Sequence, residues 1–260
     1  MKKTLSAAIA AATLSMGLAA PAMAEVPGLS ANVGFLSDYY FRGNHLGTSS
    51  PYVGLDYEVA GFYVGTWLCD DGTGGTGNNG LEVDYYFGYG MEHGPFSWTL
   101  GFTGYEYTYS ADNEGEFNLN LGLYGVALTY NYGLDNNGSS VTDDDSDHKY
   151  QFVTLGWSND NFGVTYGNYK VMKVSDSFKV GPSFTYTEVY DPFGKKLPNP
   201  AGVMKDDGYQ YLELSASGEL AGFDVGVTLG RKFEEKWGGV KVTSAGGEYI
   251  YLDISKSFSF

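Results

Sequence analysis

Several residue types that most soluble proteins rely on are scarce in this sequence. Cys69 is the only cysteine, so no intramolecular disulfide can form. Basic residues are also few, because 15 Lys and Arg stand against 31 Asp and Glu and give a net charge of −16. A nucleic-acid partner would require a basic surface, so this class of partner is excluded. We expect stability to come from strand pairing and burial alone.

Long apolar runs are missing beyond the N-terminus, where polar residues or glycine interrupt every stretch. The mean hydropathy of the whole chain is slightly negative. At the N-terminus, Lys2 and Lys3 precede an apolar stretch over residues 5–18, and Ala22-Met23-Ala24 follows as a small-x-small cleavage pattern. A membrane helix would need about 20 apolar residues. We therefore predict a signal peptide over residues 1–24 and one domain over residues 25–260, and an uncleaved N-terminal helix is the alternative. The exported chain is then either soluble or a membrane barrel.

The composition is rich in 23 Tyr, 16 Phe and 38 Gly, and the apolar residues alternate with polar ones. In residues 81–89, Leu81, Val83, Tyr85, Phe87 and Tyr89 form one face, and the residues between them form another. Alternation with a period of two predicts β-strands with two different faces. The same pattern recurs over residues 96–103, 117–123, 126–132, 162–167 and 223–229.

The lengths of the connections favour a membrane barrel over a soluble β-sandwich, which would show the same local pattern. Short links near residues 59–61, 124–125, 158–161 and 218–222 alternate with long polar ones near 69–80, 106–115, 133–148, 170–208 and 232–248. Short turns at one rim and long loops at the other are typical of outer-membrane barrels. We predict an all-β, antiparallel transmembrane β-barrel of about 12 strands, or 14 if Ser177 to Tyr190 adds two. The soluble sandwich stays the alternative fold.

The C-terminal residues have the same alternation. Ile250, Leu252, Ile254, Phe258 and the terminal Phe260 share one face. This ending resembles the strand that outer-membrane proteins present to their assembly machinery. We therefore predict the barrel-assembly machinery as a partner that binds through the Phe260 strand.

Motifs spread along the chain resemble one known family. The motifs are Ser37-Asp38-Tyr39-Tyr40-Phe41-Arg42-Gly43, the block from Asp56 to Trp67, Glu82-Val83-Asp84-Tyr85-Tyr86, the segment from Gly222 to Val227, and Ile254-Ser255-Lys256-Ser257-Phe258. Together they are similar to the TorF-like family of outer-membrane porins. The sequence departs from the family pattern in Asn44-His45-Leu46 and in the final Ser259 and Phe260. The resemblance implies an outer-membrane barrel that acts as a porin.

Charged residues on the predicted inward face are the candidate site. The pore-lining candidates are Asp38, Arg42, Asp56, Glu58, Glu82, Asp84, Glu213, Asp224 and Asp253. Because this set is acidic, a water-filled lumen would attract cations, and Arg42 would narrow the pore by pairing with a carboxylate. The predicted function is passive diffusion of small hydrophilic solutes with a cation preference. The alternatives are a satisfied polar network that plugs a closed surface barrel, or a hydrolase at the outer rim built from Asp38, His45 and His148.

The remaining predictions concern ligands. We expect no catalytic site, no cofactor and no metal site, although the acidic run of residues 143–147 has Asp oxygens of the kind that Ca²⁺ prefers. Bridging of divalent cations to lipopolysaccharide is the alternative for this run. The other predicted partners are outer-membrane lipid, lipopolysaccharide and small hydrophilic solutes.

The signal peptide gives the first testable prediction. Mass spectrometry of the protein from outer membranes should find Glu25 at the N-terminus. Changing Ala24 to a bulky residue (Ala24→Phe) should block cleavage, because signal peptidase accepts only small residues at this position. The uncleaved precursor should then accumulate. A mature N-terminus that retains Lys2 and Lys3 would contradict the prediction.

Overall fold

The computed structural model describes residues 26–71, 80–108, 113–136, 147–173, 207–237, 240–242 and 247–260. Thirteen β-strands run through these residues. They are β1 (Leu29–Phe41), β2 (Asn44–Val59), β3 (Phe62–Asp70), β4 (Leu81–His93), β5 (Phe96–Tyr107), β6 (Asn113–Leu123), β7 (Val126–Asn136), β8 (Asp147–Ser158), β9 (Phe162–Lys173), β10 (Gly208–Leu220), β11 (Phe223–Trp237), β12 (Val240–Val242) and β13 (Glu248–Ser259). No helix in this described part of the chain is long and apolar enough to cross a membrane.

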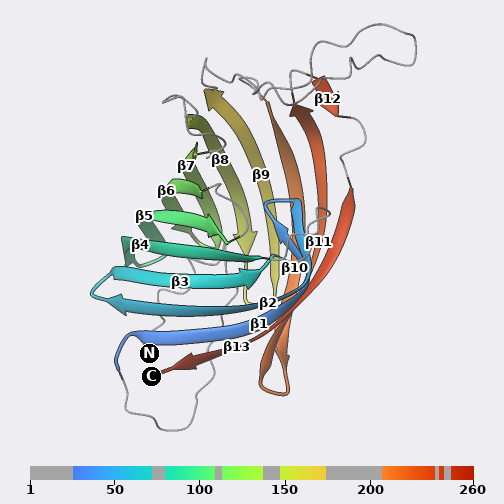
Figure 1. The fold of residues 1–260 in the computed structure, drawn as a ribbon. Helices are drawn as coiled ribbons and strands as arrows, with labels where there is room; N and C mark the ends of the chain where they lie inside the picture. Colours follow the sequence, from blue (N-terminus) through green and yellow to red (C-terminus); the bar gives the residue numbers. More distant parts are fainter. Residues whose placement is uncertain are drawn as a thin grey trace, which may run out of the picture.

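Twelve of these strands form a closed antiparallel barrel (Figure 1). Each strand from β1 to β11 pairs with the next, and β13 closes the ring by pairing with both β11 and β1. The short β12 pairs only with the end of β11 and lies outside the ring. The prediction of 12 strands is thereby confirmed.

The alternative of 14 strands is wrong, because β9 is hydrogen-bonded directly to β10. Their register runs from Phe162 opposite Ala216 to Lys170 opposite Gly208. No strand can stand between two neighbours that already pair. The segment from Ser177 to Tyr190, which raised this alternative, lies outside the described residues.

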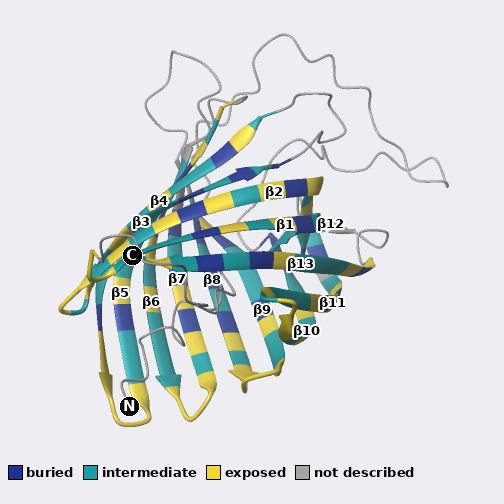
Figure 2. Ribbon diagram, turned by 90° about the horizontal axis from the view of Figure 1, so that it is seen from below, coloured by how far each residue is buried: buried dark blue, intermediate teal, exposed yellow. Residues whose placement is uncertain are grey.

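The distribution of burial is the reverse of that in a soluble protein. Outward positions carry large apolar side chains, such as Leu100 at 56% exposed and Phe162 at 61%. Inward positions carry polar ones, such as Thr99 at 2% exposed and Glu116 at 0%. Figure 2 shows these classes alternating along the strands. A soluble sandwich would bury its apolar rows between two sheets, so the closed ring excludes that alternative, and its apolar outer face suits lipid.

Tight turns gather at one end of the barrel, here called the short-turn rim. Ala60–Gly61, Tyr124–Gly125 and Ala221–Gly222 each have two consecutive residues with positive φ, between 50° and 87°. Two positive φ values are the requirement of a type I′ hairpin turn, which matches the twist of antiparallel strands. The ends of the ring meet at the same rim, where the Phe260 amide donates to the Leu29 carbonyl oxygen at 3.0 Å.

The lipid-facing assignment can be tested by the depth at which a charge is placed. Leu100 lies in the middle of the outward row of β5, whereas Leu123 lies beside the Tyr124–Gly125 turn and is 51% exposed. In lipid vesicles, Leu100→Arg should lower the free energy of unfolding by about 2–4 kcal/mol, and Leu123→Arg by about 0–1 kcal/mol. Urea titration measures both values. Equal effects of the two substitutions would contradict a membrane-embedded outer face.

Candidate functional site

The first hairpin leaves the barrel wall and turns into the lumen. β1 pairs with β13 only as far as Leu36, and β2 pairs with β3 only from Tyr52 onward. Residues 37–51, here called the inner hairpin, therefore pair only with each other in the sheet. In Figure 1 the blue tip of this hairpin lies within the ring, near β10.

Local backbone features explain the bend. The register of the hairpin shifts between Tyr39 and Tyr40, and such a bulge bends a strand and increases its twist. The tip is the turn Arg42–Gly43, with φ values of 53° and 78°. A Cβ atom on Gly43 would lie 2.9 Å from the Cβ of Tyr211. Glycine thus lets the tip sit directly against the inner surface of β10.

The tip is fastened to several walls of the barrel. Arg42 makes a two-pronged ion pair with Glu116 of β6, in which Nη2 lies 2.7 Å from Oε2. Asn44 donates to the Tyr209 hydroxyl of β10 at 2.7 Å and accepts from the Lys232 ammonium of β11 at 2.8 Å. The first hairpin therefore crosses the lumen and is held from opposite sides.

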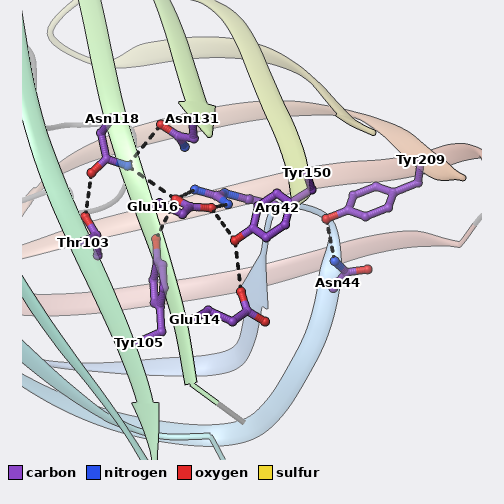
Figure 3. A network of polar contacts seen from close by, with 10 residues as sticks. All are labelled: Arg42, Asn44, Thr103, Tyr105, Glu114, Glu116, Asn118, Asn131, Tyr150 and Tyr209. Carbon is purple, nitrogen blue, oxygen red and sulfur yellow. Dashed lines mark hydrogen bonds and ion pairs between the residues drawn. The ribbon is translucent and has the colours of Figure 1, made fainter. Parts of the chain in front are cut away.

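Glu116 is the centre of a buried polar network (Figure 3). The Tyr150 hydroxyl donates to its Oε1 at 2.9 Å, and the Tyr105 hydroxyl donates to its Oε2 at 3.1 Å. The Asn118 amide contributes a longer contact of 3.4 Å. The Glu116 carboxylate is fully buried, so these donors and Arg42 replace its lost hydration.

The guanidinium of Arg42 is also enclosed by aromatic rings. Its Cζ atom lies 4.5 Å from the ring centroid of Phe41 and 4.2 Å from that of Phe152. Cation–π contacts of this kind stabilise a desolvated guanidinium. The charge of Arg42 is consequently committed to this one position.

Other inward carboxylates are paired with tyrosine instead of with basic residues. The Tyr86 hydroxyl donates to Asp56 at 2.5 Å, Tyr249 to Glu213 at 2.8 Å, Tyr52 to Asp253 at 2.9 Å, and Tyr39 to Glu82 at 3.2 Å. A phenol donates a hydrogen bond but carries no charge. Tyrosine thus holds these carboxylates in place without supplying a compensating positive charge.

A cavity of about 650 Å³ fills the lumen below the tip. It extends from the short-turn rim, at Asp160, Asn161 and Asp224, up to Arg42. Hydroxyl and amide side chains cover much of its wall, and tyrosines with Trp67 cover most of the rest. Of the described residues that line it, six are acidic, namely Asp84, Asp160, Glu213, Glu219, Asp224 and Asp253, and Arg42 is the one basic residue.

Most of the predicted site residues lie on the inner side of the barrel. Arg42, Asp84, Glu213, Asp224 and Asp253 line the cavity. Their role in a conducting pore stays a prediction.

The other predicted site residues lie apart from the cavity lining. Asp56 and Glu82 bind the tyrosines described above, and Glu58 is partly exposed near the end of β2. Asp38 lies on the inner hairpin, where its Oδ1 is 3.4 Å from His45 Nε2.

Three details differ from the sequence analysis. Arg42 does not share a strand face with Asp38, because β1 ends at Phe41 and Arg42 occupies the turn. Cys69 lies in β3 and is fully buried beside Trp67 and Tyr39, rather than in a loop. Glu116, the partner of Arg42, was missed because the alternation was traced only from Phe117. Extending the same pattern back by one step would have placed Glu116 on the inward face.

The structure brings together only part of the hydrolase alternative. Asp38 and His45 are neighbours on the inner hairpin and are both partly exposed, whereas the side chain of His148 lies outside the described residues. Within the described ranges, no three His, Cys, Asp or Glu side chains are arranged to hold a metal ion. Residues 143–146 of the acidic run also lie outside these ranges.

Comparisons with known proteins identify a family. The model of a family described as a bacterial protein of unknown function (Gcw_chp) matches residues 21–188. No curated protein matches the chain in sequence. The resemblance to TorF-like porins stays a prediction.

Three solved structures show the range of similar barrels. The KdgM porin has 9% identity and a TM-score of 0.46, with 89% of this chain and 99% of that chain covered. OprD of Pseudomonas aeruginosa has 12% identity and a TM-score of 0.40, with 90% and 67% covered. LpxR from Salmonella typhimurium has 9% identity and a TM-score of 0.37, with 89% and 100% covered. The barrel assignment here rests on the strand pairing of the chain itself.

The ion pair at the tip gives a testable prediction about stability. Arg42→Met should lower the free energy of unfolding by about 3–5 kcal/mol, because it leaves the buried Glu116 carboxylate without its counter-charge. Adding Glu116→Gln to Arg42→Met should restore part of the loss. Urea titration in lipid vesicles measures both.

The matched control is Arg231, whose pairing with Glu248 at 3.6 Å is largely exposed. Arg231→Met should change the free energy of unfolding by less than about 1 kcal/mol. Equal losses from Arg42→Met and Arg231→Met would show that the tip is not fastened by its ion pair.

Proposed function

This chain belongs to the Gcw_chp family, and we propose that it forms a narrow channel in the bacterial outer membrane for passive diffusion of small hydrophilic solutes. The single observation that supports this function best is the cavity of about 650 Å³, lined in part by acidic, hydroxyl and amide side chains, inside a closed barrel with an apolar outer surface. In a closed barrel, every wall strand has its backbone hydrogen bonds satisfied by a neighbour on each side. A sheet that spans a membrane requires this, because hydrocarbon offers no hydrogen bonds to an exposed edge. The acidic, hydroxyl and amide groups of the lining then give water a path along the inside.

The charge of the lumen supports a cation preference. Six acidic residues line the cavity, and the charge of Arg42 is already balanced by Glu116. The tyrosine partners of Glu213 and Asp253 are neutral, so these carboxylates keep an attractive field for cations. Rings of Asp and Glu favour cations in other pores by the same electrostatics.

In this proposal the inner hairpin is the constriction of the channel. Its tip contacts β6, β10 and β11, so a solute must pass beside Arg42 or displace it. The network around Glu116 sets the resistance of that passage. Export by a cleaved signal peptide, contact with lipopolysaccharide and assembly through the Phe260 strand belong to the same proposal.

The fastened tip favours a second candidate function, a barrel that is closed at rest. The buried ion pair and the Asn44 contacts join opposite walls across the lumen. A closed barrel would serve as a surface scaffold and would conduct only when the tip is released. The two candidates differ in the conductance of the unmodified protein.

Planar-bilayer recording tests both candidates. The purified, folded protein should give discrete conductance steps, with a reversal potential that favours K⁺ over Cl⁻ in a salt gradient. Glu213→Gln combined with Asp253→Asn should reduce that preference, because two lumen charges are lost. Glu248→Gln should not change the preference, because the Glu248 side chain is 80% exposed and lies on the face of β13 that points away from the cavity.

Arg42→Gln separates the channel from the closed barrel. Conductance that appears only in this variant would support the closed barrel. Silence of both the unmodified protein and the variant would overturn the channel. A reversal potential that favours Cl⁻ would overturn the cation preference alone.

A further inference from the structure

Two neighbouring carboxylates on the inner face of β4 each have a buried oxygen that accepts no hydrogen bond from the described residues. Glu82 is fully buried, and Asp84 lines the cavity two residues further along the strand. The Tyr39 hydroxyl donates to Glu82 Oε1 at 3.2 Å. Glu82 Oε2 and Asp84 Oδ1 are buried, and no described residue donates a hydrogen bond to either atom. Buried carboxylate oxygens without donors are costly, so this position calls for a positive partner.

The basic residues of the described lumen are engaged elsewhere. Both outer nitrogens of the Arg42 guanidinium are bound to Glu116. Lys232 lies 3.1 Å from Glu235 and also donates to Asn44. Neither Arg42 nor Lys232 therefore supplies a counter-charge to Glu82 and Asp84, so both carboxyl groups are available to a cationic ligand.

Aromatic side chains surround this position and favour an organic cation. Tyr39 and Trp67 pack edge to face with ring centroids 5.6 Å apart, and Tyr52 packs against Trp67 at 5.5 Å. These three rings line the same cavity as Asp84. Aromatic rings attract ammonium groups through their quadrupole and pack against alkyl chains. A carboxylate beside a cluster of rings is thus suited to an alkylammonium group.

The size and entrance of the cavity fit such a ligand. Its volume of about 650 Å³ lies in the range of small-molecule pockets, about 300–1,000 Å³. Asp160, Glu219 and Asp224 line its mouth at the short-turn rim and would attract a cation inward. A bare divalent ion fits less well, because the described residues offer no group of three metal-ligating side chains. A neutral sugar would leave both carboxylates uncompensated.

Resting on the proposed channel function, we propose that the lumen binds small alkylamines, with the ammonium group at Asp84, next to the buried Glu82, and the alkyl chain against Tyr39, Tyr52 and Trp67. The site is reached from the short-turn rim, below the tip of the inner hairpin. Amines are then the class of solute that the channel selects within its preference for cations.

Calorimetric titration of the folded, full-length protein in detergent micelles at neutral pH tests this site. The probe is 1,5-diaminopentane, and 1,5-pentanediol is its uncharged counterpart of the same length. We expect saturable binding of the diamine and none of the diol. Asp84→Asn should weaken diamine binding at least tenfold, and Glu82→Gln should weaken it as well. The control Asp38→Asn should leave it unchanged, because Asp38 lies on the inner hairpin beside His45 and outside the cavity lining, whereas Glu82 lies two residues from Asp84 on the same face of β4.

Several outcomes would overturn the site. Equal binding of the diol, or unchanged diamine affinity in a folded Asp84→Asn variant, would do so. Competition by Na⁺ at a concentration equal to that of the diamine would reassign the position to an inorganic ion. If Asp84→Asn does not fold, the diamine and diol titrations of the unmodified protein still decide the proposal.

The same measurement is independent of the channel function. A protein that conducts ions but binds no diamine loses only the amine site. A protein that binds the diamine but is silent in bilayers loses only the channel.

Discussion

The closure of the sheet between β13 and β1 is the constraint on which the rest of the structure depends. A hydrocarbon environment offers no hydrogen bonds, so each strand must find both neighbours within the barrel. The register from Ser30 opposite Ser259 to Leu36 opposite Asp253 provides the last of these pairings. Once the ring is closed, the outer face has to be apolar because it meets hydrocarbon. The polar side chains of each strand are then enclosed on the inner face. The apolar outer surface of the barrel and the polar contacts in its lumen both follow from this closure.

The polar interior created by closure contains carboxylates that need hydrogen-bond donors, and tyrosine hydroxyls supply them. An acidic lumen with few basic residues must satisfy its carboxylates without neutralising them. Phenol hydroxyls do this for Asp56, Glu213 and Asp253. Glu116 differs because it also holds Arg42, and with it the tip of the inner hairpin. One ion pair therefore anchors the tip of the inner hairpin, and the other carboxylates of the lumen are left for the proposed cation pathway.

Alternation along the chain predicted the strands and their two faces, and the lengths of the connections predicted a number of about 12. Alternation was informative because every second residue of a strand points to the same face, and the face toward lipid tolerates few polar residues. The prediction was weaker at strand ends. Glu116 was left out of the predicted strand because the polar residues before Phe117 resemble loop residues, although Glu116 continues the inward face. Cys69 was misplaced for the same reason, since Asp70 and the glycines that follow obscure the end of β3.

By itself, the sequence determined the class of fold, the faces of the strands and the acidic balance of the interior, because these depend on residue type and on local periodicity. Tertiary structure alone decided that Arg42 meets Glu116, 74 positions away, and that residues 37–51 turn inward from the wall. The same holds for the tyrosine that each carboxylate contacts. These contacts depend on which strands lie opposite each other in the closed barrel. The order of residues along one strand does not determine the distance to the strand on the other side of the lumen.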